Sequence, residues 1–348
     1  MTTPIRIAMV GCGFFAQNHL HAWHHLRESG VELVAVCDVD KIKADEAAKT
    51  FAASAYYSIE NMLDVVKPDA VDIATRMDTH KALFALLAER SISSIIQKPL
   101  APSWQECMDI AHMAFKHGVF LAIHENFRFQ APMRRIKEII KSGEIGAPSW
   151  AHLSFRTGYD VYRTQPYFYT EDRLAVLDVG VHLLDLARFF LGEVKHLSCE
   201  TQRRNSKVRA EDTATMLLRH ESDAVCIIDC SYEARRMPDN FPQTLVEIEG
   251  PSGSIICGAD FSLFVTSNGK MRSEDAAPPS LPWGVDPFRV VQESVLAANS
   301  HFLSCLQTGQ KASTDIEDNL KTHALVEAAY LAAASGRAEN PPVWEGST

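Results

Sequence analysis

Residues 5–125 alternate between short, continuously apolar runs and longer amphipathic stretches, and this alternation limits the fold more than any other feature of the chain. The apolar runs cover 5–10, 32–38, 70–75, 94–99 and 119–125, and the helical stretches lie near 15–28, 41–51, 79–90 and 103–117. Strands that are apolar on both faces are typical of a parallel sheet covered by helices on both sides. The first part of the chain is therefore predicted to form an α/β domain, a Rossmann doubly wound parallel sheet over residues 1–125.

The alternation stops after about residue 130. A helix is expected at 131–140, two more close the chain near 288–307 and 315–336, and strand-like segments lie between them at 149–156, 194–204, 213–220, 224–232, 244–250, 254–257 and 261–267. Short turns join most of these strands, which favours antiparallel pairing. We expect residues 126–348 to form an α+β domain with a large, mainly antiparallel, open-faced sheet, and the C-terminal helix to be able to pack back on the first domain. A chain of 348 residues is long enough for two such domains.

Composition excludes several classes of function. The formal charge of −10 leaves no basic field to attract nucleic acid, and the chain has no apolar span long enough for a membrane helix or a signal peptide. We therefore expect a cytoplasmic protein with a small-molecule ligand. The eight cysteines lack paired C-x-x-C spacing, so reduced core thiols are expected. His21 and His25 fall on one helix face without a third ligand, and no metal site is predicted.

The segment GCGFFA directly follows the first apolar run and opens the first helix. It matches the G-x-G-x-x-A fingerprint, in which Gly11 allows the tight turn, Gly13 lets the backbone approach a pyrophosphate, and Ala16 permits close packing of the helix on the strand. The N-terminus of the helix then receives the phosphates. This context predicts a dinucleotide site.

Asp38 ends the second strand, 22 residues after Ala16. A carboxylate at this position can bind the adenosine ribose hydroxyls and would repel a 2′-phosphate, so NAD is favoured as the cofactor over NADP. Lys41 and Lys43 lie close enough that some use of NADP stays open.

The mostly apolar run LDVGVHLLDLARFF at 177–190 carries two carboxylates and an imidazole. Asp178, His182 and Asp185 are spaced by four and three residues, so an α-helix would bring them to one face. An isolated pair of this kind is more typical of a buried hydrogen bond than of chemistry, and Asp185 is equally suited to pairing with Arg188 or capping a loop. Lys98 ends the fourth strand, at the carboxyl edge where doubly wound sheets bind ligands.

The motifs taken together are more specific than any one of them. In this order the fingerprint, ATRMDTH at 74–80, QKP at 97–99, HENFRFQAP at 124–132, SGEIGAP at 142–148 and DVGVHLLD at 178–185 cover almost the whole chain. They resemble the Gfo/Idh/MocA family of nicotinamide-dependent oxidoreductases. The resemblance implies Lys98, Asp178 and His182 as catalytic residues, facing the nicotinamide. It also implies a set of cofactor-binding residues: Gly11, Gly13, Phe14, Phe15, Asp38, Thr75, His80, Gln97 and Lys98.

Two positions depart from the family pattern. Gln97 stands where the family usually has Glu, which removes a charge beside the reacting centre. Arg76 stands where Pro is common, which leaves the geometry of that loop open.

The reaction that the resemblance implies is oxidation of a sugar at its anomeric carbon, with hydride transfer to NAD and loss of the hydroxyl proton to a base. An imidazole, with an ordinary pKa of about 6.5, is a better base than a lysine, whose pKa would have to fall from about 10.4 to about 7–8. We therefore expect His182 to take the proton, Lys98 to polarise the same oxygen, and Asp178 to orient one of them and hold the sugar. Another sugar or polyol dehydrogenase of the same family, an NAD-requiring glycoside hydrolase and a non-catalytic dinucleotide sensor stay open as alternatives.

Sugar specificity is expected in the second domain. The segment FRTGYDVYRTQPYFY at 155–169 is rich in Tyr, Arg and Gln, which suit the hydroxyls and apolar faces of a sugar. Candidate substrate residues there and next to the last parallel strand are Asn126, Arg128, Arg156, Tyr159, Asp160, Gln165 and Tyr167, together with Asp178 and His182. An open sheet face also needs a cover, and the resemblance implies a homo-oligomer, a dimer or a tetramer.

Overall fold

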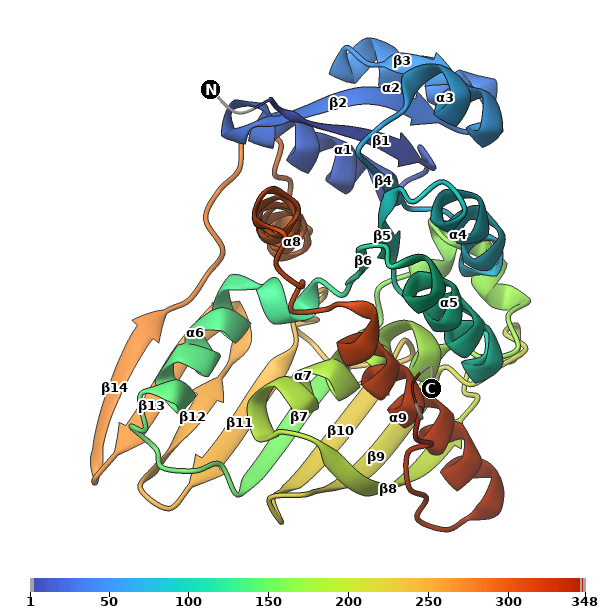
Figure 1. Ribbon diagram of the computed structural model, residues 1–348. Helices are drawn as coiled ribbons and strands as arrows, with labels where there is room; N and C mark the ends of the chain where they lie inside the picture. Colours follow the sequence, from blue (N-terminus) through green and yellow to red (C-terminus); the bar gives the residue numbers. More distant parts are fainter. Residues whose placement is uncertain (1–2, 345, 347–348) are drawn as a thin grey trace. The chain divides into compact units, whose positions relative to one another are not determined.

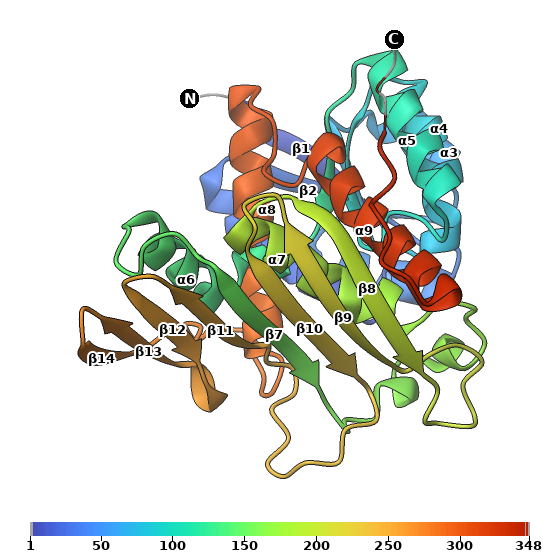
Figure 2. The same ribbon diagram turned by 90° about the horizontal axis from the view of Figure 1, so that it is seen from below.

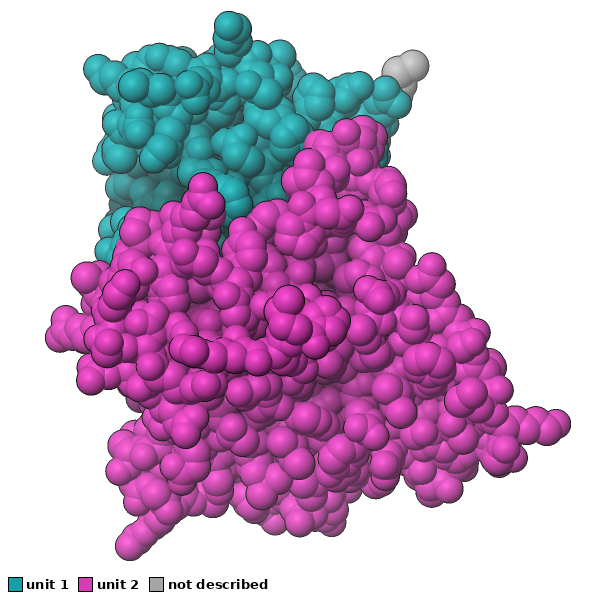
Figure 3. All heavy atoms as spheres, turned by 180° about the vertical axis from the view of Figure 1, so that it is seen from behind, with its two compact units in different colours: residues 1–125, 295–320, 344–348 teal, residues 126–294, 321–343 magenta. Residues whose placement is uncertain are grey.

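The computed structural model describes residues 3–344 and 346. The chain divides into two compact units, coloured separately in Figure 3. Unit 1 comprises residues 1–125, 295–320 and 344–348, and unit 2 comprises residues 126–294 and 321–343. Each unit has its own sheet and is described by itself.

Within the described residues, unit 1 is built on a six-stranded parallel sheet in the order β3-β2-β1-β4-β5-β6 (Figure 1). The strands are β1 (Ile5–Val10), β2 (Val31–Cys37), β3 (Ser54–Tyr56), β4 (Ala70–Ile73), β5 (Ser93–Gln97) and β6 (Leu121–His124). The helices are α1 (Ala16–His25), α2 (Lys41–Phe51), α3 (Ile59–Val66), α4 (His80–Ala88) and α5 (Trp104–His117). This is the Rossmann strand order, and it confirms the predicted fold of the first part of the chain.

Local sequence explains why these elements begin where they do. The side chain of Ser58 caps α3 by accepting a hydrogen bond from the backbone N–H of Asn61, and Ser103 caps α5 in the same way through Glu106. The sequence prediction missed β3 and α3. β3 is only three residues long and lies at the edge of the sheet, so it carries too short an apolar pattern to be recognised.

The other edge of the unit 1 sheet is covered by a later part of the chain. The backbone N–H of Ile123 in β6 donates to the carbonyl oxygen of Thr314 at 2.8 Å. The hydroxyl of Thr314 donates back to the carbonyl oxygen of Ile123 at 2.7 Å. These bonds satisfy backbone groups that an open edge strand would expose. Thr314 lies in the segment between α8 (Arg289–Thr308) and α9 (Ile316–Ser335).

In the described residues, unit 2 contains an eight-stranded sheet in the order β14-β13-β12-β11-β7-β10-β9-β8. The strands are β7 (Trp150–Arg156), β8 (Val194–Gln202), β9 (Thr213–His220), β10 (Val225–Ser231), β11 (Leu245–Gly250), β12 (Gly253–Cys257), β13 (Ser262–Ser267) and β14 (Lys270–Asp275). The sheet is mainly antiparallel, as predicted, but β7 and β10 pair in parallel. They are joined by a long connection rather than a hairpin, which permits parallel pairing.

The unit 2 sheet has one covered and one open face. Ala151, Leu153 and Phe155 of β7 are buried and alternate with more exposed neighbours. On the covered face lie α6 (Ala131–Lys141) and α7 (Val181–Leu191), and Figure 2 shows the strands from the other side, with α7 behind them. The β7 side chains that alternate with these three, such as Arg156, therefore lie on the open face.

Two further predictions concern the whole described chain. All eight cysteines lie in its described part, where they are buried and form no disulfide. No helix among residues 3–344 and 346 is both long and apolar enough to cross a membrane.

A buried polar cluster lies inside unit 1. The carboxylate of Asp72 in β4 accepts a hydrogen bond from His19 Nδ1 at 2.8 Å and one from Trp23 Nε1 at 2.7 Å, both from α1. His124 at the end of β6 lies with its ring centroid 4.1 Å from that of His19 and is hydrogen-bonded to Asn299 at 2.8 Å. Burial, reinforced by the charge of His19, lowers the pKa of His124 from 6.5 to about 3. His124 is therefore neutral in the folded chain near pH 7.

This depressed pKa predicts a pH dependence of stability. Between pH 6.5 and pH 3 an unfolded histidine binds a proton that folded His124 does not, so unfolding becomes more favourable as the pH falls. A His124→Gln variant keeps a hydrogen-bonding side chain but cannot titrate. We expect its free energy of unfolding to fall less steeply between pH 6.5 and pH 5, by up to about 1.4 kcal/mol per pH unit. Chemical denaturation at several pH values measures this slope.

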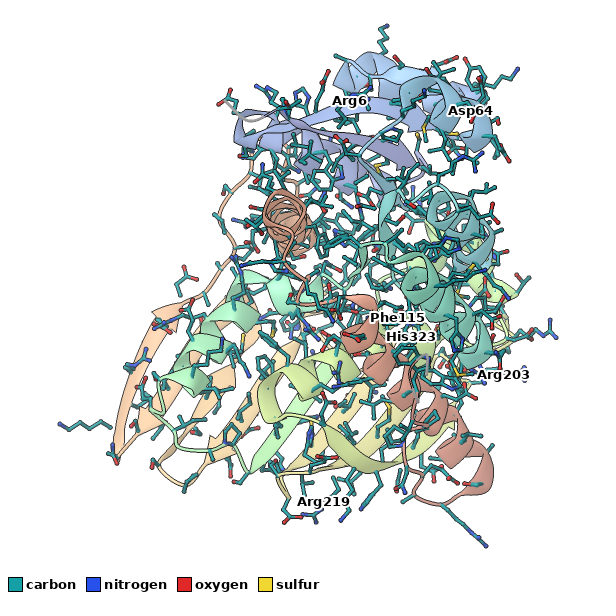
Figure 4. All side chains as sticks on the ribbon, in the orientation of Figure 1. Arg6, Asp64, Phe115, Arg203, Arg219 and His323 are labelled. Carbon is teal, nitrogen blue, oxygen red and sulfur yellow. The ribbon has the colours of Figure 1, made fainter. Side chains whose placement is uncertain are left out.

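The matched control is His24→Gln, because His24 is exposed on α1. His323 of unit 2, labelled in Figure 4, is a second buried histidine, and burial lowers its pKa to about 4. It titrates equally in all three proteins and cancels in the comparison. Identical slopes for the wild type and His124→Gln would contradict the account.

Candidate functional site

The glycine loop after β1 has the backbone geometry that a dinucleotide fingerprint requires. Gly11 has φ +96°, and a Cβ built there would lie 2.5 Å from the carbonyl oxygen of Ala74, so only glycine fits. A Cβ on Gly13 would meet no atom within 4 Å, which leaves the loop surface open to a ligand. In the described residues α1 has no side-chain cap and no acidic residue in its first turn, so its N-terminal N–H groups suit a phosphate. The two phenylalanines of the loop differ in exposure. Phe14 is 58% exposed, whereas Phe15 packs edge-on against His19.

Asp38 is held at the end of β2 by two backbone N–H groups. One carboxylate oxygen accepts from Cys12 in the glycine loop at 2.8 Å, and the other accepts from Asp40 at 2.9 Å. These hydrogen bonds fix the position of the Asp38 carboxylate relative to the glycine loop. This arrangement suits a ribose whose hydroxyls bind Asp38 while its phosphates reach the glycine loop.

The loop after β4 is tied to the loop after β5 through a buried histidine. His80 Nδ1 lies 3.1 Å from the carbonyl oxygen of Leu100, and His80 Nε2 lies 3.3 Å from that of Thr75. Burial lowers the pKa of His80. Arg76, where the family commonly has Pro, has φ −72°, a value that a proline would also adopt. The backbone at Arg76 is therefore compatible with the proline that is common in the family.

Gln97 and Lys98 stand at the carboxyl end of β5. Gln97 is 7% exposed, and its side-chain oxygen accepts a hydrogen bond from the backbone N–H of Lys98 at 3.1 Å. A glutamate oxygen could accept the same bond, so Gln97 preserves this contact without the charge. Unit 1 thus gathers the glycine loop, Asp38, Thr75 and Lys98 at the carboxyl ends of adjacent strands.

In unit 2, the segment that carries Asp178 differs from the predicted regular α-helix. Residues Val176–Gly180 form a π-helical turn, and α7 begins only at Val181. The carboxylate of Glu211 holds this start by accepting from the backbone N–H groups of Leu174 and Val176, both at 3.1 Å. The wider turn means that Asp178 and His182 do not lie on one regular α-helical stripe.

Asp178 is half-buried and has a tyrosine partner that the sequence analysis did not identify. The hydroxyl of Tyr232, just after β10, donates to the Asp178 carboxylate. Tyr232 is 5% exposed, and burial together with the charge of Asp178 raises its pKa well above 10. The tyrosine therefore stays protonated and remains a donor at any pH at which an enzyme would work. No sequence motif marked this residue.

Asp185 faces another loop of unit 2. Its two carboxylate oxygens accept from Arg128, one of them from Nε at 2.8 Å, and the hydroxyl of Thr322 donates to it at 3.1 Å. Arg188, the partner considered from the sequence, lies 4.0 Å away and instead makes a bidentate pair with Glu193. Asp185 thus positions the segment that contains Arg128. His182, one helical turn earlier, is 4% exposed and stacks on Phe127.

The remaining substrate candidates fall into different surroundings. Asn126 donates to Ser294 at 2.7 Å, and Tyr159 stacks on Phe241 with ring centroids 4.1 Å apart. Tyr167 donates to Gln165 at 2.6 Å on an exposed turn. Asp160 caps the short turn Val161–Arg163.

Arg156 is not brought together with His182. Its guanidinium donates to Asp229 at 3.2 Å on the open face of the sheet. The neighbouring Phe155 lies on the covered face, where its ring centroid is 6.2 Å from that of Phe127.

A polar pocket of about 370 Å³ lies within unit 2 beside Tyr232, the hydrogen-bond partner of Asp178. Tyr159, Tyr162, Tyr169 and Tyr232 line it together with Glu233 and the loop at 204–207. Tyr162 and Asn205 both donate to Glu233, at 3.3 and 3.0 Å. The tyrosine faces and the fixed carboxylate are groups that suit the apolar faces and hydroxyls of a sugar.

Comparison with known families agrees with this geometry. Residues 5–125 match the model of the oxidoreductase family with an NAD-binding Rossmann fold, and residues 133–256 match the GFO/IDH/MocA C-terminal domain. The chain belongs to the GFO/IDH/MocA family. It is an oxidoreductase whose cofactor is NAD, and the glycine loop and Asp38 are the features of this structure that fit that cofactor.

Individual relatives match nearly the full chain. A D-apiose dehydrogenase from Paraburkholderia graminis is 41% identical over 331 residues, covering 95% of this chain and 88% of the relative. A D-apiose dehydrogenase from Rhizobium rhizogenes is 40% identical over 336 residues, covering 96% and 97%. The crystal structure of an oxidoreductase from Agrobacterium radiobacter in complex with NAD+, L-tartaric acid and magnesium has a TM-score of 0.95 and 39% identity, covering 97% of this chain and 98% of that one.

The position of Asp38 predicts the choice between the two dinucleotides. An Asp38→Ser variant removes the carboxylate that would repel a 2′-phosphate, so we expect the ratio of kcat/KM for NADP to that for NAD to rise at least about tenfold. Asp40→Ser is the matched control, because the Asp40 carboxylate caps α2 by accepting from the backbone N–H groups of Ile42 and Lys43. Steady-state kinetics with both cofactors give the ratio. An equal ratio in the two variants would show that Asp38 does not discriminate.

Proposed function

We propose that this chain is an NAD-dependent dehydrogenase that oxidises the anomeric carbon of D-apiose to the lactone. The observation that carries the proposal is the similarity to two D-apiose dehydrogenases, at 40 and 41% identity over nearly the whole chain.

The proton of the reacting hydroxyl goes to His182. When bound, NAD accepts the hydride from the anomeric carbon. The C–OH group of the sugar becomes a C=O group only if the hydroxyl proton leaves as well. A neutral imidazole can take that proton near pH 7, whereas an amine would first have to lose its own. The nearly complete burial of His182 fits a base that is shielded from competing water.

Lys98 and Asp178 have supporting roles in the proposal. As a cation, Lys98 donates a hydrogen bond to the same sugar oxygen and stabilises the negative charge that develops there. Asp178 accepts a hydrogen bond from a sugar hydroxyl or from the base. The hydroxyl of Tyr232 occupies one of its carboxylate oxygens, which limits the directions in which Asp178 can accept.

Sugar recognition is proposed for the polar pocket of unit 2. Tyr159 and Tyr232 line this pocket, and Glu233, held by Tyr162 and Asn205, is a fixed acceptor for a sugar hydroxyl. A site built around such hydrogen bonds rejects analogues that lack the matching hydroxyl. Arg156 is left out of this proposal because of its contact with Asp229 on the open face.

A panel of pentoses and hexoses, each with NAD, tests the proposed substrate. We expect D-apiose to give the highest kcat/KM, measured as NADH absorbance, and sugars that lack a recognised hydroxyl to fall by about 10²-fold or more. Mass spectrometry should find a product two hydrogens lighter than the sugar. Cleavage of a glycoside without net NADH would identify a hydrolase instead, and cofactor binding without turnover would identify a sensor.

The open face of the unit 2 sheet is proposed to be the contact between copies of this chain. It carries Leu217, Ile256 and Phe264, which are 52, 41 and 38% exposed. Ile256 and Phe264 are direct cross-strand partners, so they form one continuous apolar patch. Covering such a face with a second copy removes apolar surface from water.

The oligomeric state follows from this patch. We expect light scattering to show a dimer or a tetramer, and Phe264→Glu to shift the protein toward monomer at micromolar concentration because the charge would be buried in the contact. Val65→Glu is the control, since Val65 is 65% exposed on α3 in unit 1. A wild-type monomer, or equal behaviour of the two variants, would refute the proposed contact.

A further inference from the structure

The imidazole of His182 lies flat against the ring of Phe127. Their centroids are 3.7 Å apart and the ring planes differ by 2°. Both side chains are buried, with 6% of Phe127 and 4% of His182 exposed. Aromatic pairs in protein cores more often meet edge-on or offset at 4.5–7 Å. The contact is therefore unusually close and parallel.

The residues on both sides of Phe127 are anchored. Phe127 begins the short turn η3 (Phe127–Phe129). Before it, Asn126 donates to Ser294 at 2.7 Å. After it, Arg128 binds Asp185 through two hydrogen bonds, and Asp185 follows His182 by three residues on α7. The helix that carries the imidazole thus also holds the turn that carries the phenyl ring.

This geometry restricts the rotation of the imidazole. The χ2 torsion of histidine is broad and roughly two-fold, so an unrestrained ring can turn over, which puts a ring carbon in the place of each nitrogen. During that rotation the ring plane passes through the perpendicular. A phenyl ring at contact distance on one face blocks the passage, because the imidazole edge would enter it.

We propose that Phe127 is a positioning residue for His182. It holds the imidazole in the one orientation that presents the same nitrogen to the sugar hydroxyl in every turnover. The inference rests on the proposed function, in which His182 takes the hydroxyl proton. Phe127 itself contacts neither sugar nor cofactor in this proposal and acts only through the base.

The test compares substitutions within one aromatic cluster. Phe127→Leu keeps an apolar side chain but removes the flat ring, whereas Phe127→Tyr keeps a flat ring at this position. Phe155→Leu is the matched control, because Phe155 neighbours Phe127 in the same core but is not stacked on His182. Phe127→Met serves as a second ring-free variant if the leucine does not fold.

We expect Phe127→Leu to lower kcat by about 10- to 100-fold, since small misplacements of a catalytic group have effects of this size. The KM for the sugar and the Kd for NAD should change less than about threefold. Phe127→Tyr and Phe155→Leu should stay within about threefold of the wild-type kcat. If Phe127 had a purely structural role, Phe127→Leu and Phe155→Leu would instead lower kcat to a similar extent.

A spectroscopic readout is independent of turnover. The phenyl ring current should shift the ring protons of His182 upfield in the wild type and in Phe127→Tyr, with the resonances assigned by their loss in His182→Gln. Phe127→Leu should abolish the shift. If the shift disappears while kcat stays equal to that of Phe155→Leu, the inference is wrong. If His182→Ala keeps full activity, the fault lies in the proposed base and the positioning role fails with it.

Discussion

A buried ion pair between Arg128 and Asp185 organises the candidate site of unit 2. Both side chains are nearly inaccessible to water, and the pair is bidentate. Removing two charges from water costs about as much as their attraction returns, so such a pair contributes geometry more than net stability. Here the geometry joins η3 to α7. The two motifs NFRF and DVGVHLLD meet through this contact between residues that are 57 positions apart in sequence.

The corresponding constraint in unit 1 is steric. Gly11 allows the glycine loop to approach the loop after β4, and the N–H of Cys12 then reaches Asp38. A side chain at position 11 would separate the two loops and move the carboxylate of Asp38 from its place. His80 extends the same set of contacts to the loop that follows Lys98. The predicted cofactor-binding residues are thus positioned by hydrogen bonds between a side chain of one loop and a backbone group of another.

Much of this could be predicted from the sequence, because it depends on local patterns. Continuous apolar runs gave the parallel sheet, and the spacing from the glycine loop to Asp38 gave the dinucleotide site. The π-helical turn at Val176–Gly180 could not be predicted, since an i, i+4 argument assumes a regular helix. Glu211, whose carboxylate holds the start of this turn, lies more than 30 residues away.

Other parts of the site depend on side chains without a sequence signal. Phe127 and Tyr232 are ordinary apolar or aromatic positions until the fold places them beside His182 and Asp178. The parallel pairing of β7 with β10 is likewise decided by tertiary packing rather than by strand composition. Arg156 illustrates the converse, because the alternation of side chains along β7 turned a plausible sugar ligand to the open face.

In the proposed reaction Lys98 and His182 act on one oxygen in one step, and a double-mutant cycle tests this proposal most directly. Single-turnover rates with D-apiose and NAD would be measured for Lys98→Ala, His182→Ala and the double variant. Groups that act as a unit are strongly non-additive, so the double variant should be slower than the worse single variant by less than about tenfold. Losses in the double variant equal to the product of the two single losses would show that the two residues act independently.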